Sequence, residues 1–348
     1  DDAELILNPA TATYRRSKND EAGYNNLGKV NVWGGTARGN VQITGINVAN
    51  ATVNNGNDDA SKKGEVTIDH GYGIAGTDNS VIRNKKDSKI TVTGKYDPAA
   101  QDTTNGYISE ARTRAGFAAE TEATGENYGI VGLSTNNVRD HAAYGSARYG
   151  ENAIAIENVE GKIKVDGSLA VGIYAANKKY DNGGDGADQN RVTIKYDNKN
   201  AGTANLIDLN NGNTNKEKRD IGIALVNEVK DMVNAGNRGG IITLNTKNTV
   251  ATPDFVTKYR GIGIYGESTD IKFQNGSTGV TVETKDDGAG IWMTDDSHVG
   301  VTGDHNSRTY NYTYTGANDK KGFGMVFSST MTGSNTVAEN HLNINSGG

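Results

Sequence analysis

Paired carboxylates are the first residues in this 348-residue chain whose types and spacing could do chemistry. Two acidic doublets, Asp286-Asp287 and Asp295-Asp296, stand beside a recurring glycine-containing phrase. Glycoside hydrolysis needs two carboxyl groups at a defined separation, so a polysaccharide-degrading enzyme is one hypothesis. Adjacent residues of a strand point to opposite faces, however, and Gly, Ser and Thr flank both doublets. We interpret them as turn residues and keep the enzyme as the alternative.

Histidine is the next residue type that could act as a base or a metal ligand. The chain has five histidines, and none lies in a sequence typical of a Ser-His-Asp triad. His298 and His305 stand in a turn-rich stretch beside Asp295, Asp296 and Asp304, where a divalent metal or a solvated loop would both fit. We favour the solvated loop. The sequence therefore predicts no catalytic residue at these positions.

One segment resembles a calcium-binding repeat. Residues 183–190, Gly-Gly-Asp-Gly-Ala-Asp-Gln-Asn, nearly match the nonapeptide of calcium-binding β-helices. The apolar residue of that repeat is replaced by Asn190, and the copy stands alone. Because such sites form between successive copies, we expect neither a metal nor a cofactor.

Composition excludes several further classes. There is no cysteine, which removes thiol nucleophiles, disulfides and cysteine-ligated zinc. The formal net charge of −6 argues against nucleic acid as a partner, because such proteins carry a basic stripe. No apolar run is long enough to span a membrane. Because the chain begins with two aspartates and ends in two glycines, we expect a piece of a larger protein.

A phrase of one apolar residue, a glycine and a second apolar residue repeats along the chain and indicates the elements that position these groups. Its copies are Tyr72-Gly73-Ile74, Tyr128-Gly129-Ile130, Val171-Gly172-Ile173, Ile221-Gly222-Ile223, Ile262-Gly263-Ile264, Ala289-Gly290-Ile291 and Phe323-Gly324-Met325. Short alternating runs such as Lys89–Thr93 and Lys162–Val165 follow the phrases, bounded by Gly, Asn and Asp. These runs are typical of β-strands. Strand-only repeats with variable insertions predict an all-β fold, a parallel β-helix formed by residues 1–348 as a single segment.

Strand alternation makes a specific prediction for the repeated phrase. Both apolar residues should face the core and the glycine should face outward, leaving bare backbone on which another segment packs. The residues that follow the phrases should then share one outward column. These residues are Ala75, Val131, Tyr174, Ala224, Tyr265, Trp292 and Val326.

Two insertions interrupt the repeats and are each expected to contain a short helix. The first spans residues 97–127 and includes Ile108–Ala123, which is rich in helix-forming residues. The second spans residues 226–238 and includes Val226–Asn234. Insertions on a solenoid lie on its outside, often on the functional face.

Aromatic side chains and one arginine are the candidate binding residues, since Tyr, Trp and Arg dominate protein-binding hot spots and aromatic faces also stack on sugars. Tyr265 and Trp292 would be neighbours in adjacent turns of the solenoid. The alternative is that such aromatics only stabilise neighbouring strands. The full set is Tyr144, Arg148, Tyr149, Tyr265, Trp292, Tyr310, Tyr312 and Tyr314.

The phrases Gly261-Ile262-Gly263-Ile264-Tyr265 and Val171-Gly172-Ile173-Tyr174-Ala175, set among strands rich in Asn, Thr and Lys, resemble fusobacterial type V autotransporter passenger domains. This family includes the RadD-like, arginine-inhibitable adhesins and their galactose-binding relatives. The resemblance covers about residues 65–345 and rests on the style of the repeats. It implies a right-handed β-helix, exported to the bacterial cell surface through a C-terminal β-barrel translocator in the outer membrane.

The resemblance also implies a role in virulence or coaggregation: adhesion to surface proteins or glycans of partner bacteria or host cells, with no catalytic residues. Two alternatives stay open, a β-helical enzyme that degrades polysaccharides and a pure spacer stalk. The receptor and its binding site are not determined by the repeats.

Overall fold

Short strands account for the regular structure of this chain. The computed structural model describes residues 5–7, 23–32, 43–49, 51–69, 71–77, 80–93, 126–134, 154–166, 169–177, 192–198, 206–210, 220–227, 240–246, 253–257, 261–267, 269–274, 281–284, 288–294, 298–301, 311–314, 323–328 and 341–342. These residues form strands and turns, and no helix occurs among them.

The strands belong to three sheets. Sheet A contains, in spatial order, β1 (Leu5–Leu7), β4 (Ile43–Ala49), β7 (Gly71–Thr77), β10 (Glu126–Ser134), β13 (Leu169–Asn177), β16 (Ile221–Asn227), β19 (Ile262–Glu267), β22 (Ala289–Thr294) and β25 (Phe323–Ser328). Sheet B contains β2 (Gly23–Asn26), β5 (Thr52–Asn55), β8 (Ser80–Asn84), β11 (Ile154–Val159), β14 (Val192–Asp197), β17 (Gly240–Asn245), β20 (Thr269–Phe273), β23 (His298–Val301) and β26 (His341–Leu342). Sheet C contains β3 (Lys29–Val32), β6 (Glu65–Ile68), β9 (Lys89–Val92), β12 (Lys162–Asp166), β15 (Ile207–Asn210), β18 (Phe255–Val256), β21 (Thr281–Thr284) and β24 (Asn311–Tyr314).

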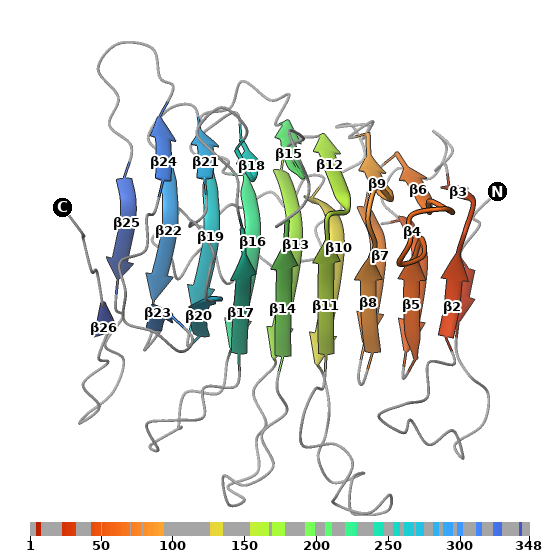
Figure 1. Cartoon of the computed structure of the whole chain (residues 1–348), viewed down its shortest axis with the longest axis horizontal. Helices are drawn as coiled ribbons and strands as arrows, with labels where there is room; N and C mark the ends of the chain where they lie inside the picture. The colour runs from red at the N-terminus through yellow and green to blue at the C-terminus, as the bar shows by residue number, and fades with distance from the viewer. Residues whose placement is uncertain are drawn as a thin grey trace, which may run out of the picture.

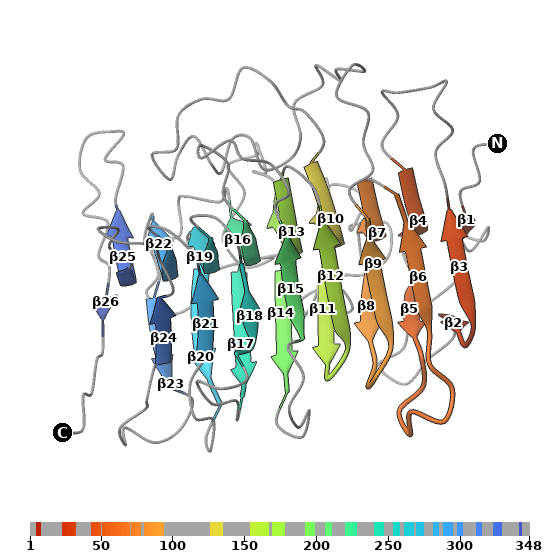
Figure 2. The same ribbon diagram turned by 90° about the horizontal axis from the view of Figure 1, so that it is seen from above.

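The chain visits sheets A, B and C in turn and then repeats the circuit, so each of the first eight rungs contributes one strand to each sheet, and β25 and β26 add a further strand to sheets A and B. Neighbouring strands in every sheet are parallel, as in the pairs β7–β10, β8–β11 and β9–β12. Figures 1 and 2 show the rungs following one another from the N-terminal to the C-terminal end. The predicted parallel β-helix is confirmed.

The predicted bounds of the two insertions overlap with strands. Glu126 and Asn127, which the prediction placed in the first insertion, belong to β10. Val226 and Asn227, expected to start the second helix, belong to β16. The predicted helix Ile108–Ala123 and the rest of Val226–Asn234 lie outside the described residues.

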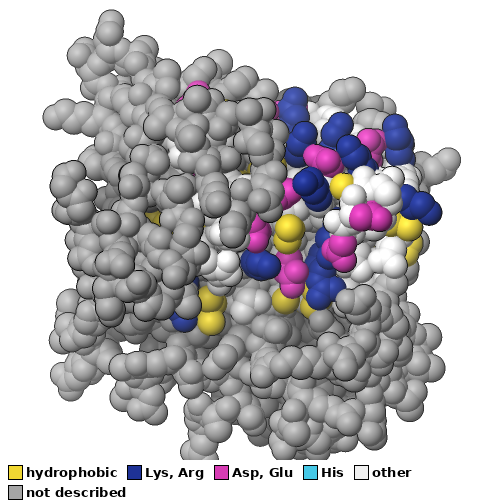
Figure 3. Space-filling model, in the orientation of Figure 1, with side chains coloured by type: hydrophobic (Ala, Val, Ile, Leu, Met, Phe, Trp, Pro, Cys, Tyr) yellow, Lys and Arg dark blue, Asp and Glu magenta, His cyan; other side chains and the backbone are white. Residues whose placement is uncertain are grey.

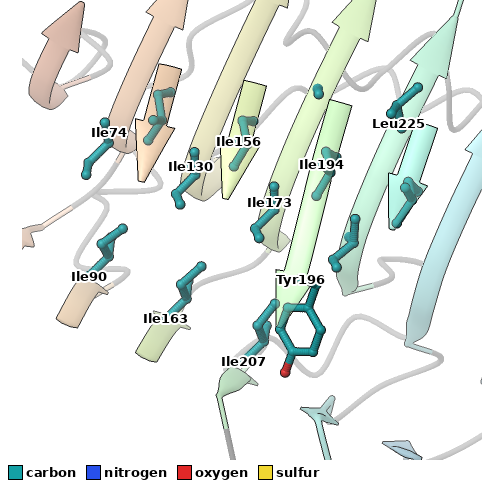
Figure 4. Packing of buried hydrophobic residues seen from close by; sticks show 14 of the residues in the cluster. Ile74, Ile90, Ile130, Ile156, Ile163, Ile173, Ile194, Tyr196, Ile207 and Leu225 are labelled. Carbon is teal, nitrogen blue, oxygen red and sulfur yellow. The ribbon is translucent and has the colours of Figure 1, made fainter. Parts of the chain in front are cut away.

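Columns of branched aliphatic side chains fill the core, with a contribution from each sheet in each rung. In one rung Ile130, Ile156 and Ile163 come from sheets A, B and C, and each is at most 1% exposed. The next rung repeats the arrangement with Ile173, Ile194 and Ile207 (Figure 4). Burying one such side chain contributes roughly 1.5–3 kcal/mol, so a narrow core suffices when it is repeated along the axis.

The glycines of the repeated phrase face the core, and the prediction that they face outward is wrong. A methyl group at Gly172 would lie 2.7 Å from the Ile207 side chain of sheet C. Tyr72, which precedes Gly73, belongs instead to a cluster on the other face of sheet A, while Ile74 lies in the core. Strand pairing between β7 and β10 skips the glycine, so Gly and Ile face inward in succession. This break in alternation is what strict period-2 reasoning missed.

These positions require glycine because the next rung leaves no space for a side chain, not because the backbone adopts a conformation that only glycine allows. A methyl group at Gly73 would lie 2.5 Å from the carbonyl oxygen of Gly129, and one at Gly129 would lie 2.6 Å from that of Gly172. The same approach recurs along sheet A up to Gly290. Positive φ angles occur among the described glycines only at Gly56 and Gly71. We call this series, Gly45, Gly73, Gly129, Gly172, Gly222, Gly263 and Gly290, the glycine column.

A ladder of buried asparagines holds the turn between sheets B and C. Asn26 Nδ2 donates to Asn55 Oδ1 at 2.8 Å, Asn55 to Asn84 at 2.9 Å, and Asn84 to Asn158 at 2.8 Å. Asn55 also donates to the carbonyl oxygen of Lys89, at the start of β9. Each amide thus satisfies the next one in a place that water does not reach.

The ladder ends where the same register position becomes aromatic. Asn158 is in register with Tyr196, whose ring packs on Phe255 with centroids 5.0 Å apart. The Tyr196 hydroxyl donates to the carbonyl oxygen of Asp254 at 3.3 Å. Hydrophobic contacts therefore replace amide hydrogen bonds in the C-terminal rungs.

Replacing Gly129 by Ala is expected to lower the free energy of unfolding by about 1–3 kcal/mol or more, because the added methyl overlaps the Gly172 carbonyl and the Ile163 side chain. Chemical denaturation followed by circular dichroism measures the change. Gly266→Ala is the matched control in sheet A, since its methyl would make ordinary contacts of 3.4 Å and more. Equal effects of the two substitutions would contradict the close approach.

Replacing Asn84 by Ala is expected to cost about 1–3 kcal/mol for each buried amide group left without a partner, which includes the Asn158 oxygen. The same denaturation experiment applies. The control is Asn54→Ala, because Asn54 donates to Asn25 at an exposed site. A loss no larger than the control's would show that the ladder contributes little.

Candidate binding surface

A second apolar cluster covers the face of sheet A that points away from the core. Most of its side chains precede the glycine of a phrase or follow the core isoleucine, and Leu133, Ala176 and Val226 stand three positions after that isoleucine. We call this cluster, with two partly buried members at its edge, the outer face of sheet A. It consists of Tyr72, Ala75, Tyr128, Val131, Leu133, Val171, Tyr174, Ala176, Ile221, Ala224, Val226, Ile262, Tyr265, Ala289 and Trp292.

Strand register confirms that the residues after the phrases share one column, which belongs to the cluster on the face of sheet A away from the core, and most of its described members are buried. Ala75 pairs with Val131, Val131 with Tyr174, and the series continues through Ala224 to Tyr265. Tyr265 and Trp292 are direct neighbours in adjacent rungs, as the aligned phrases predict. Trp292 is in register with Val326, the last predicted member of the column.

An aromatic stack adds residues that sequence analysis placed in the core. The rings of Tyr72 and Tyr128 lie 5.2 Å apart, and those of Tyr128 and Tyr174 lie 6.0 Å apart. Tilted pairs at such distances add about 0.5–1.5 kcal/mol beyond area burial. The sequence signal that could have predicted this stack is that tyrosine precedes the glycine in two successive phrases, at Tyr72 and Tyr128.

The members of this face differ in how much side-chain area a binding partner could reach. Tyr265 is 1% exposed and donates its hydroxyl to Glu267 Oε2 at 3.3 Å, beside a fully buried carboxylate. Trp292 is half-buried. Since an almost inaccessible ring has little area to contact a receptor, Trp292 rather than Tyr265 carries this part of the binding hypothesis.

The other candidate binding residues remain predictions. Tyr144, Arg148, Tyr149 and Tyr310 lie outside the described residues. Tyr312 and Tyr314 belong to β24, in register with Val282 and Thr284 of β21 respectively.

The residues considered for catalysis or metal binding lie mostly outside the described part of the chain. This applies to both acidic doublets, to His305 and to the calcium-like segment 183–190. β23 places His298 in register with Asp270 and with His341. Among the described residues, no group of three His, Asp or Glu side chains could hold a metal ion.

Two described groups have clearly shifted acidities, and they lie in different environments. Burial, with the nearby Asp254 as a further cause, raises the pKa of Tyr196 well above its ordinary value. Hydrogen bonds from Ser61 lower the pKa of Asp59, which is exposed in a turn. The Tyr196 hydroxyl is sealed in the core, so its shift reflects packing and not a site that a substrate reaches.

Insertions are distributed unevenly around the solenoid. The strand bounds leave 33 residues between β9 and β10, 19 between β10 and β11, and 14 between β13 and β14. Connections between sheets B and C have at most nine residues. Every connection longer than ten residues adjoins a strand of sheet A.

Comparisons with known proteins leave the family of this chain open. Neither a protein-family model, nor a curated protein, nor a solved structure matches it. Within the described residues, no helix is long and apolar enough to cross a membrane.

Replacing Tyr265 by Ala is expected to lower the free energy of unfolding by about 3–5 kcal/mol, the usual cost of removing a buried aromatic side chain. Trp292→Ala should cost clearly less, because Trp292 is half-buried. Chemical denaturation of the two variants side by side measures the difference. A larger loss for Trp292→Ala would mean that the outer face is stabilised mainly at its edge.

Proposed function

We propose that this chain is a non-catalytic segment of a bacterial cell-surface adhesin, exported as the passenger of an autotransporter. In this proposal it binds a protein or glycan receptor on other bacteria or host cells. The observation that carries the proposal is that the connections longer than ten residues all lie at the junctions that involve sheet A, five of them between sheets A and B and none between sheets B and C.

The solenoid supports this role mechanically. Each rung contacts mainly its neighbours, and the glycine column and asparagine ladder repeat the same contacts along the axis. Such an array is rigid and can grow or shrink by whole rungs, which suits a structure that holds binding loops away from a membrane.

The insertions support a role in recognition. Residues that bind partners are often found on loops fixed to a rigid scaffold. Here the two connections that adjoin β10, of 33 and 19 residues, are the longest between consecutive strands. Sequences resembling autotransporter adhesins, and a chain without cysteine that suits export in an unfolded form, agree with this assignment.

Binding of the purified, fluorescently labelled chain to partner bacteria and host cells tests the proposal. Free arginine and galactosides serve as competitors, and circular dichroism verifies the β-fold of each sample. We expect saturable binding that is reduced when residues 97–125 are replaced by a short Gly/Ser linker. Replacement of residues 211–219 by a linker of equal length is the matched control.

Two results would overturn the proposal. Absence of binding by the folded chain would make it a spacer, with recognition elsewhere. Release of sugar products from a polysaccharide, abolished by Asp286→Asn or Asp295→Asn, would make it an enzyme. Unchanged binding after the 97–125 replacement would move the binding site to another surface.

A further inference from the structure

A column of charged side chains runs along the edge of sheet C in the N-terminal rungs. Lys29, Glu65, Lys89 and Lys162 occupy the first position of β3, β6, β9 and β12, and strand register stacks them in this order. Successive rungs of a sheet lie about 4.7–4.9 Å apart, so each side chain is within reach of the next. In Figure 3 lysines and acids gather on this face.

The acids in this region already have lysine partners. Glu65 pairs with Lys29 at 3.2 Å. Two further ion pairs occupy the neighbouring turns, between Lys63 and Asp87 at 3.5 Å and between Lys86 and Glu160 at 3.2 Å.

Lys89 and Lys162 are the exception in this column. They face each other in register, Lys89 is exposed, and neither forms an ion pair within the described part of the chain. Like charges directly opposite in a sheet are destabilising. On sheet B, a column of charged residues instead places opposite charges next to each other. Arg83, Glu157 and Lys195 alternate in sign along it, and Arg83 Nε lies 3.3 Å from Glu157 Oε2. Because a local arrangement that costs stability is often kept for function, the like-charged pair of Lys89 and Lys162 is a candidate binding position.

A polar column lies beside the two lysines. Asn31, Thr67, Thr91 and Lys164 occupy the third position of the same four strands. Two residues of strand separate the columns, about 7 Å. Lys164 is 51% exposed, with its ammonium 3.6 Å from Asp166. The surface therefore presents hydroxyl and amide groups alongside two positive charges without acid partners.

The start of β9 is held firmly, so the lysine backbones are fixed before a ligand arrives. The Lys89 amide donates to the Gly64 carbonyl at 2.8 Å, and the Lys162 amide donates to the Ser88 carbonyl at 2.8 Å. The Lys89 carbonyl accepts the hydrogen bond from the Asn55 amide in the ladder. Such preorganisation lowers the entropic cost of binding.

We propose that Lys89 and Lys162, with Thr91 and Lys164 beside them, bind an acidic polysaccharide whose chain lies along the solenoid axis. Its carboxylate or sulfate groups would sit between the two ammonium groups, and its hydroxyls would contact the polar column. The proposal rests on the proposed adhesive function and names a ligand class for it. Nucleic acid is disfavoured because the two columns contain no aromatic side chain on which bases could stack, and a lipid surface is disfavoured because they contain no apolar side chain.

Retention of the full chain on immobilised dextran sulfate and polygalacturonate tests the site, with neutral dextran as reference. We expect binding that weakens between about 0.01 M and about 1 M salt, as the Debye length falls from about 30 Å to about 3 Å. Lys162→Glu should weaken it about tenfold or more, because it reverses one of the two charges. The same substitution removes a like-charge pair, so the unfolding temperature should be unchanged or higher, which separates lost binding from lost folding.

Lys85→Gln is the matched control, since Lys85 is paired with Asp58, and it should leave retention unchanged. Equal retention of the Lys162→Glu variant, equal retention on neutral dextran, or tighter binding to duplex DNA or anionic phospholipid vesicles would each overturn the proposal. Equal polysaccharide retention by Lys162→Glu, together with normal cell binding, would reject this site and leave the adhesin. Retention on polysaccharide without any cell binding would reject the adhesin and leave this site.

Discussion

The close approach of glycine backbones in sheet A is the constraint on which the rest of the structure depends. A carbonyl oxygen of the next rung stands where each glycine would carry its methyl group, as between Gly129 and Gly172. This removes one side chain per rung from the core and lets the side chains of sheet C, such as Ile163, fill the space. The following isoleucine also faces inward, so the break in alternation sends the residue before the glycine to the outer face. One steric requirement thus creates both the narrow core and a second apolar surface.

The opposite corner of the solenoid depends on polar contacts. Buried amides of Asn26, Asn55 and Asn84 form a chain of hydrogen bonds, and Asn26 and Asn55 also donate to the first carbonyls of β6 and β9. Removing a single amide leaves its neighbours unsatisfied, so the ladder acts as a unit. The same corner bears the surface charges, most of them paired across rungs. Lys89 and Lys162 are therefore in register at a corner whose backbone is held by buried hydrogen bonds and whose surface is charged.

Two surfaces with different chemistry follow from this division. The outer face of sheet A is aromatic and aliphatic and is buried except at Ala75 and Trp292, and the longest connections of the chain begin or end at strands of this sheet. The N-terminal part of sheet C is polar and carries two lysines without acid partners. A segment that engages cells through its insertions and an acidic glycan through its stem would use both surfaces at once.

Local pattern was sufficient to predict the parallel β-helix and the outward column, because period-2 alternation and a repeated Gly phrase are encoded residue by residue. The orientation of the glycines was predicted wrongly, because the pairing of β7 with β10 skips Gly73 and the neighbouring strands pack closely against it, which alternation within one strand does not reveal. The sequence also supplied Lys89 and Lys162 at the start of two similar strands. Their juxtaposition was decided by the tertiary structure, since they stand 73 positions apart in the sequence, with β10, β11 and two long connections between them, and only strand register brings the like charges together.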